Sequence, residues 1–264
     1  MNQFQTTAEI TKLEHICPDI LRMTFRAPDI AANALPGQFI MLRVSDGLDP
    51  LLRRPFSIHQ TTADGLVQIL FKVLGKGTAL LAALLPGREI NLVGPLGRGF
   101  DLAERSAVCL VGGGMGIAPL YFASRELLRR AVPGKLVVLL GSRTEAEIAP
   151  LKQDFLDLGV TDLHIATDDG SLGHHGYVAE LMDTCMDGAE NWTVCTCGPH
   201  PMMRAVAEKS KKRSFQCQVS LETMMACGIS ACLGCAIPRA GLSGDYLHVC
   251  KDGPVFDANE VAWL

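Results

Sequence analysis

Apolar and polar residues alternate with a period of two through much of the first hundred residues. The pattern is clear in LRMTFR (21–26) and again in VQILFKV (67–73). Further short apolar segments, at 38–44, 55–60 and 88–93, are separated by turns rich in Gly, Pro, Asp and Asn. Short strands joined by tight turns are typical of a small antiparallel barrel. We expect one helix in this region, at 78–85, ended by Pro86 and Gly87.

The pattern changes after Arg105, where short apolar runs alternate with stretches of helical periodicity. This alternation predicts a parallel sheet with crossover helices. One helix is expected to begin at a capping box formed by Thr144 and Glu147 and to stop at Gly159. The apolar runs that we expect to form the strands begin at 107, 135, 161, 193 and 215.

These patterns divide the chain into three units and predict an α/β plus β fold. The units are an N-terminal antiparallel β-barrel at 1–102, a central parallel α/β sheet at 103–221 and a small C-terminal module at 222–264, where periodicity is lost. With 264 residues, 48% of them hydrophobic and 20% charged, the composition excludes a disordered chain.

Charge and hydropathy exclude two classes of partner. The net charge of −4 offers no basic footprint for nucleic acid. The longest uncharged stretch, 106–124, contains several glycines and Pro119, so we expect no membrane segment there. The N-terminal residues show neither a basic start nor an apolar stretch of the kind found in secretory signals, so we expect a cytoplasmic protein.

The most specific signal is a cluster of cysteines near the C-terminus. Cys227, Cys232, Cys235 and Cys250 fall within 24 residues, although only ten cysteines occur in the chain. Their C-x4-C-x2-C…C spacing is the plant-type spacing of a [2Fe-2S] cluster, and the small residues between them suit a tight loop. A structural zinc site is the main alternative, although zinc ribbons usually bring paired knuckles. The cysteines at 17, 109, 185, 195 and 217 are interpreted as core residues.

A glycine-rich turn predicts a nucleotide site in the central unit. Gly112, Gly113, Gly114 and Gly116 follow a buried strand and open a helix, where a pyrophosphate can approach the backbone. The motif is not a strict G-x-G-x-x-G, and the next strand ends at Arg143 where an acidic ribose ligand is expected. Tight packing is the alternative explanation of these glycines.

Three more motifs suit a phosphate or a flat ring. The run Arg53, Arg54, Pro55, Phe56 and Ser57 offers a guanidinium fork and an aromatic ring, and Gly77 with Thr78 offers amides at the start of a helix. Cys197 ends a predicted strand at the sheet edge where α/β proteins bind ligands. Solvated arginines, an ordinary helix cap and an ordinary turn cysteine are the alternatives.

The order of these motifs resembles the ferredoxin reductase superfamily and, within it, the family of electron-transfer subunits of type 1B dihydroorotate dehydrogenases. The resemblance covers essentially the whole chain and rests on LLRRPFSI, FKVLGKGT, GPLGRGF, TDDGSLGHHGYV and SLETMMACGISACLGC. Related sequences usually have glycine where this chain has Ser230. If that position needs a positive φ, Ser230 adds strain of about 1 kcal/mol without removing a ligand.

The resemblance implies three cofactors and a partner. FAD would lie in the barrel, NAD over the glycine-rich turn and beside Cys197, and [2Fe-2S] on the four clustered cysteines. The partner would be an FMN-containing catalytic subunit that oxidises dihydroorotate in pyrimidine (UMP) biosynthesis, in a heterotetramer with two copies of each chain. The FAD residues implied are those of the 53–57 motif together with Leu70, Phe71, Lys72, Gly77 and Thr78.

Cofactor chemistry agrees with this order. Nicotinamide exchanges a hydride and the cluster passes single electrons, so a flavin must stand between them. Cys197 is the candidate catalytic residue, as a group that packs where flavin and nicotinamide meet. The alternatives are a diaphorase subunit of another complex, such as a hydrogenase or a ferredoxin:NAD(P) oxidoreductase, and a non-enzymatic zinc module that senses nucleotide.

Overall fold

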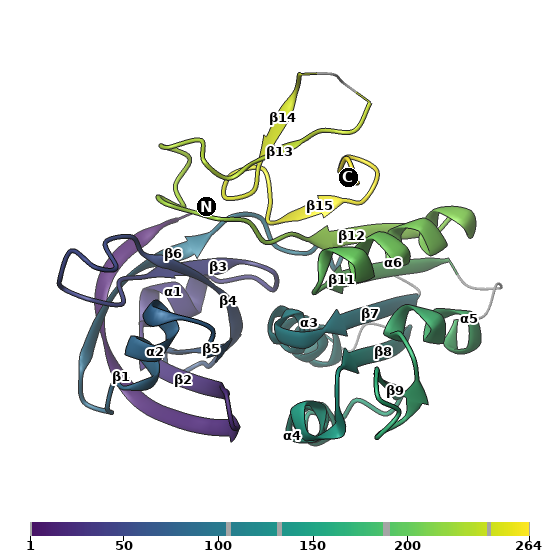
Figure 1. The fold of residues 1–264 in the computed structure, drawn as a ribbon, viewed down its shortest axis with the longest axis horizontal. Helices are drawn as coiled ribbons and strands as arrows, with labels where there is room; N and C mark the ends of the chain where they lie inside the picture. The colour runs from purple at the N-terminus through teal and green to yellow at the C-terminus, as the bar shows by residue number, and fades with distance from the viewer. Residues whose placement is uncertain (1, 104–106, 131–133, 187–190, 242–243, 264) are drawn as a thin grey trace.

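The computed structural model describes residues 2–103, 107–130, 134–186, 191–241 and 244–263. A barrel and an open sheet with helices on its faces lie side by side, and the C-terminal segment lies across both (Figure 1). No helix in the described ranges is long and apolar enough to span a membrane. The arrangement of barrel, helix-covered sheet and C-terminal segment confirms the predicted fold class.

The N-terminal unit is a closed antiparallel barrel with the strand order β1-β2-β5-β4-β3-β6. Its interior is filled by the side chains that the alternating pattern placed on one face, including Leu21, Met23 and Phe25. The strands are β1 (Phe4–Cys17), β2 (Ile20–Arg26), β3 (Phe39–Leu42), β4 (Arg54–Thr61), β5 (Leu66–Lys72) and β6 (Glu89–Leu96).

The prediction of a single helix in this unit was wrong. The barrel carries α1 (Pro28–Asn33) as well as α2 (Lys76–Ala82), which begins two residues earlier than expected. Six residues are too few for helical periodicity to be visible, although α1 does start with a proline and an acidic residue, Asp29. In α2 the Thr78 hydroxyl oxygen accepts a hydrogen bond from the Gly75 amide at 3.2 Å, which closes the first turn.

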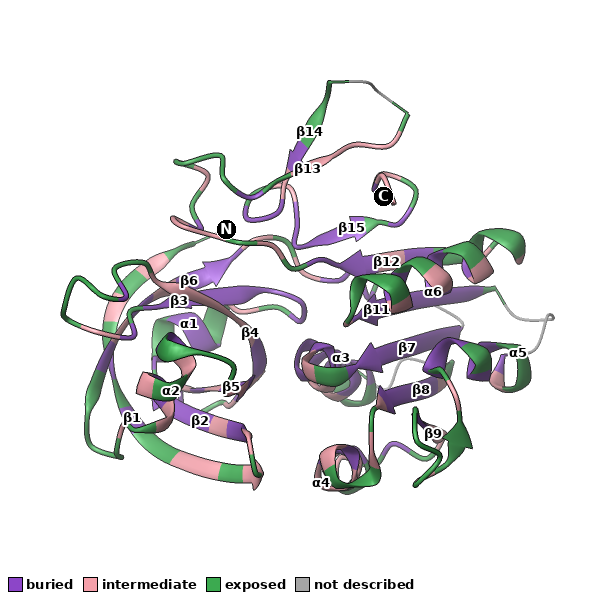
Figure 2. Cartoon of the chain, viewed as in Figure 1, coloured by how far each residue is buried: buried purple, intermediate pink, exposed green. Residues whose placement is uncertain are grey.

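The central unit is a seven-stranded sheet in the order β10-β9-β8-β7-β11-β12-β15. All neighbouring pairs are parallel except β12 with β15, and β7, β8 and β11 are largely buried beneath the helices (Figure 2). The strands are β7 (Ala107–Gly113), β8 (Lys135–Ser142), β9 (Leu163–Thr167), β10 (His174–His175), β11 (Trp192–Cys197), β12 (Gln216–Ser220) and β15 (Val255–Asp257). The helices are η1 (Gly114–Gly116), α3 (Ile117–Arg129), α4 (Glu145–Asp157), η2 (Val178–Leu181), α5 (Met182–Cys185) and α6 (His200–Lys212).

Helix α4 starts and stops where the sequence predicted, but without the predicted capping box. Thr144 occupies the N-cap and makes no capping hydrogen bond through its side chain, while Glu147 turns toward Lys72 and Arg143. An ion pair with two cations outweighs a single bond to a backbone amide. At the other end Gly159 has φ +95°, and the Val160 amide donates to the Phe155 carbonyl at 3.1 Å, as in a Schellman motif.

The C-terminal segment is joined to the sheet by backbone pairing. Its strand β15 pairs antiparallel with β12, and its hairpin of β13 (Ala236–Pro238) and β14 (Tyr246–His248) lies farther out. Three residues of β15 were too few to show any periodicity in the sequence. The 222–264 segment therefore completes one edge of the central sheet.

Candidate functional site

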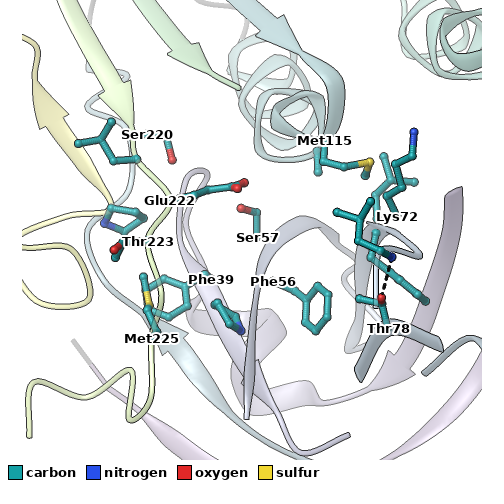
Figure 3. Close-up of a pocket in the computed structure, with 17 residues that line it drawn as sticks. Phe39, Phe56, Ser57, Lys72, Thr78, Met115, Ser220, Glu222, Thr223 and Met225 are labelled. Carbon is teal, nitrogen blue, oxygen red and sulfur yellow. Dashed lines mark hydrogen bonds between the residues drawn. The ribbon is translucent and has the colours of Figure 1, made fainter. Parts of the chain in front are cut away.

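A cavity of about 240 Å³ lies between the barrel and the central sheet (Figure 3), and we call it the flavin cavity because FAD is expected there. Seven residues predicted to contact FAD line it: Pro55, Phe56, Ser57, Leu70, Phe71, Lys72 and Thr78. The opposite wall comes from Met115 of η1, from Ala118 in the first turn of α3, and from the end of β12 and the segment that follows it, residues 220–223 and 225. The site is thus built by all three units.

The barrel wall of this cavity is aromatic. The rings of Phe56 and Phe71 meet edge to face, with centroids 5.8 Å apart and planes at 65°. They come from paired antiparallel strands, β4 and β5, so their positions are fixed by the barrel. Aromatic faces beside a polar group such as the Ser57 hydroxyl suit a flat heteroaromatic ring.

The two arginines of the 53–57 motif have different surroundings, and neither lines the cavity. The Arg53 guanidinium donates to the Asn91 carbonyl at 3.1 Å, and burial together with Arg43 lowers its pKa. Arg54 lies against α2, where a Cβ on Gly77 would come within 3.3 Å of its Nε. Arg54 and Gly77 therefore remain close to the cavity rim at Thr78, whereas Arg53 braces the barrel.

The glycine-rich turn has both packing and binding roles. Gly112 and Gly116 are required by packing, because a Cβ would lie 2.9 Å from the Leu120 side chain and 2.2 Å from the Cys197 carbonyl oxygen, respectively. Gly113 and Gly114 instead line two open cavities at the carboxyl edge of the sheet. Gly113 and Gly114 line both cavities and Gly116 lines one of them, so this part of the predicted motif faces space that a dinucleotide could occupy.

One of these cavities, which we call the dinucleotide cavity, has a volume of about 250 Å³ and is lined by several charged side chains. Arg143 and Glu147 line it from the end of β8 and the first turn of α4, Asp168 from the end of β9, and Lys72 from the barrel. Lys72 also lines the flavin cavity, so the two spaces meet at this side chain. The other cavity, which we call the glycine-turn cavity, is lined by Gly116 and His200 and shares Met115 and Glu222 with the flavin cavity.

Cys197 ends β11 as predicted, with its side chain 1% exposed. Burial, the nearby Glu222 and a hydrogen bond with Ser220 leave its pKa at about 12, so the thiol is neutral. It is absent from the lining of the flavin cavity. A buried, neutral thiol beneath the glycine-rich turn is compatible with the expected packing role, and the catalytic role of Cys197 stays a prediction.

Glu222 was missed as a site residue by the sequence prediction. Its carboxylate projects into the flavin cavity on the same side as Ser57 and also lines the glycine-turn cavity (Figure 3). Burial among the surrounding protein atoms raises its pKa. A lone Glu before a cysteine motif gives no local signal, and only the fold brings it to this position.

The four clustered cysteines form two pairs. Cys235 and Cys250 have sulfurs 3.3 Å apart, and Cys227 is hydrogen-bonded by the side chain of Cys232. Within the described residues, no three His, Cys, Asp or Glu side chains gather where a single ion would bind. Two pairs of thiols match the two irons of a [2Fe-2S] cluster better than the single point that zinc requires.

Backbone amides surround these sulfurs. Amides of Ala231 and Cys232 donate to the Cys227 sulfur at 3.3 and 3.4 Å, and the Ser230 amide donates to the Cys250 sulfur at 3.2 Å. Amide donors stabilise negative charge on ligated sulfur and so favour the reduced cluster. The loop also packs on the barrel, because a Cβ on Gly228 would lie 2.5 Å from Met41.

Comparison with known families gives a match in each unit of the chain. A family described as an oxidoreductase FAD-binding domain matches residues 7–100, and an oxidoreductase NAD-binding domain matches 110–208. A family described as the iron-sulfur cluster binding domain of dihydroorotate dehydrogenase B matches 222–262.

Curated relatives carry one name. The electron transfer subunit of dihydroorotate dehydrogenase B (NAD(+)) of Desulforamulus reducens is 40% identical over 97% of this chain and 97% of its own length. The protein of the same name from Bacillus caldolyticus is 42% identical over 86% of both chains.

A solved structure is similar over nearly the whole chain. A structure of an NADH-dependent reduced ferredoxin-NADP oxidoreductase has a TM-score of 0.86 and 30% identity, and covers 97% of this chain and 90% of that one. The cytochrome b5 reductase domain of Ulva prolifera nitrate reductase, at 19% identity and a TM-score of 0.68, shares the fold. Together with the cavity, the paired cysteines and the full-length relatives, these matches show that the chain belongs to the family of electron transfer subunits of NAD-dependent dihydroorotate dehydrogenase B.

Proposed function

We propose that this chain carries electrons to NAD+ through a [2Fe-2S] cluster and FAD. The electrons come from an FMN-containing catalytic subunit that oxidises dihydroorotate. The observation that carries the proposal is the continuity of one segment, in which residues 220–223 and 225 line the flavin cavity and Cys227 follows two residues later. The same cavity shares Met115 and Glu222 with the space beside the glycine-rich turn. A flavin in this cavity would adjoin both the cluster loop and the dinucleotide space.

The residues present fit the three groups. Bound FAD supplies the exchange between hydride and single-electron chemistry. Phe56 and Phe71 would hold its ring, and Arg54 with Gly77 and Thr78 would meet its phosphates at the rim. Gly113 and Gly114 would let a dinucleotide approach the backbone, while the buried Cys197 supports the turn from below.

The catalytic partner is proposed to dock near the cluster loop. Cys232 is exposed there, and so are the apolar side chains of Met224, Ile229 and Leu233, at 88%, 51% and 58%. These three side chains fall within one ten-residue stretch, and a concentration of exposed apolar groups is typical of interaction surfaces. An electron carrier needs its cluster near the partner because electron tunnelling falls steeply with distance. In the proposed heterotetramer, with two copies of each chain, each cluster would lie against a catalytic subunit.

The test replaces Cys232 by Ser. We expect the variant to keep its flavin and its NADH oxidation with artificial two-electron acceptors, because the flavin cavity contains no atom of Cys232. NAD+ reduction driven by dihydroorotate in the reconstituted complex should stop. Cys185→Ser, in α5 outside the cluster loop, is the matched control and should retain this activity. Full dihydroorotate-driven NAD+ reduction in a cluster-free variant would contradict the electron path.

A ferredoxin:NAD(P) oxidoreductase is the second candidate, because the similar solved structure with a TM-score of 0.86 is described as an NADH-dependent reduced ferredoxin-NADP oxidoreductase. Purification of this chain with its native partner distinguishes the two. An FMN protein that reduces the cluster on addition of dihydroorotate supports the first proposal, and reduction by ferredoxin alone supports the second.

A further inference from the structure

Arg143 occupies a position at which an arginine can determine NADP binding. It follows β8 at the carboxyl edge of the sheet, and an arginine near this strand end can accept the 2′-phosphate that distinguishes NADP from NAD. The structure shows that this guanidinium already has a partner. We propose that Glu147 sets the preference of this chain for NAD over NADP by occupying both cations that face the dinucleotide cavity; the proposal rests on the dinucleotide role proposed above.

Glu147 binds the two cations through one carboxylate oxygen. Its Oε1 accepts from the Arg143 Nη2 at 2.6 Å and from the Lys72 Nζ at 2.9 Å. The Glu147 and Lys72 side chains are 23% and 14% exposed, so solvent screens this pair only partly. These hydrogen bonds lower the pKa of Glu147 and raise those of Arg143 and Lys72, which keeps all three groups charged near neutral pH.

The charges around this cavity favour a hydroxyl over a phosphate. Lys72 and Arg143 are the cations in its lining, and Glu147 and Asp168 are the carboxylates. Asp19 adds a third carboxylate, 3.3 Å from the Lys72 Nζ, which leaves the group with one excess negative charge. A phosphate monoester carries a charge of about −1.5 to −2 at neutral pH and would be repelled. A ribose hydroxyl can donate to a carboxylate such as Asp168 without that penalty.

The position of Glu147 on α4 explains why the sequence pattern misled. Its spacing from Thr144 matches a capping box, yet the side chain leaves the helix start to reach the barrel. The same carboxylate therefore joins the barrel to the sheet and pairs with the arginine that lines the dinucleotide cavity. Neutralising it should release both cations toward an incoming 2′-phosphate.

The experiment compares binding of ADP-ribose and 2′-phospho-ADP-ribose to the full chain with its flavin and cluster, by titration calorimetry. Wild type should prefer ADP-ribose. Glu147→Gln should shift the ratio of the two Kd values toward the phosphorylated ligand by roughly fivefold or more, a change of about 1 kcal/mol. Because the gain comes from charge, it should shrink as salt is raised from 50 to 300 mM.

Glu145→Gln is the matched control, in the first turn of the same helix but outside the cavity lining, and it should leave the ratio unchanged. Glu147→Ala provides a second neutral variant, and thermal unfolding checks that each variant is folded. An unchanged ratio in both neutral variants, with ADP-ribose still bound by wild type, would overturn this inference alone. Failure of wild type to bind ADP-ribose would remove the proposed dinucleotide role as well.

Discussion

The cluster loop contains two residues in a backbone conformation that side chains rarely adopt. Ser230 and Leu233 have φ values of +64° and +59°, next to Gly228 at +72°. Ser230 therefore has the positive φ at which a residue other than glycine is strained. This backbone directs the Ser230 amide at the Cys250 sulfur, so the strained geometry serves the amide donors around the cluster.

Replacing Ser230 by Gly should stabilise the loop, because glycine adopts positive φ without a Cβ clash. The gain is limited to about 1 kcal/mol, since glycine also increases the entropy of the unfolded chain. Ser230→Val should destabilise the loop, because β-branched residues tolerate this region poorly. The rate of iron release to a chelator measures both effects.

Ser214→Gly, at φ +58° just after α6, is the control for this experiment. It should change thermal stability without altering iron release. Equal iron-release rates for the Gly and Val variants at position 230 would refute the strain argument.

The barrel and the sheet are held together by α3 and α4. His59 of β4 is buried and lies against α3, where its Nδ1 donates to the Ala118 carbonyl at 3.1 Å and its ring stacks on Tyr121. Arg22 of β2 forms an ion pair with Asp154 of α4. Ala118 also lines the flavin cavity, so these contacts set the width of the site.

His59 should make this junction sensitive to acid. Burial is the main reason that its pKa falls to about 3, with a contribution from Arg22. Between the unfolded value of about 6.5 and this folded value, the unfolded chain binds the extra proton, so His59 lowers stability as pH falls, by up to about 1.4 kcal/mol per pH unit. The effect is absent above pH 6.5.

His59→Gln should be less stable than wild type at pH 7, because it loses the ring stacking, but the difference should narrow toward pH 4.5. Urea unfolding at several pH values measures this. His175→Gln, at an exposed position on the edge strand β10, is the control and should run parallel to wild type. A stability gap for His59→Gln that stays constant with pH would show that the histidine ring is not the titrating group.

Across the whole molecule, the C-terminal segment connects the barrel and the central sheet. It pairs with the sheet through β15, packs on the barrel at Met41, and presents exposed apolar side chains outward. Helix α4 lies at the far side of the molecule from this segment (Figure 1). The surface near the cluster loop and the surface of α4 therefore offer a direct comparison.

Ile229→Glu should weaken binding of the catalytic subunit by about tenfold or more, because a charge would be buried in an apolar contact. Leu156→Glu on α4, where the leucine is 41% exposed, should leave the affinity unchanged. Biolayer interferometry with the purified FMN partner measures both. Equal affinities for the two variants would place the partner elsewhere.

Sequence patterns alone were sufficient to predict the longer elements and the groups that carry the chemistry. Alternation with a period of two is legible wherever a strand has one buried face, so the barrel strands could be predicted, and thiol spacing marks a cluster because cysteines are otherwise scattered. The sequence analysis assigns seven residues to one FAD site, and the structure brings them into one cavity: Pro55, Phe56, Ser57, Leu70, Phe71, Lys72 and Thr78. Their roles toward FAD remain predictions.

Which of these groups meet depends on how the chain folds. Glu222 enters the flavin cavity, Glu147 leaves its helix cap to pair with Lys72 of the barrel, and Arg53 turns away to Asn91. Each choice depends on a partner 38 or more residues away, or on the packing of separate units, and local propensity carries no information about such partners. Short elements such as α1 and β15 were not predicted for a related reason. Their stability comes from the surfaces they cover and not from their own few residues.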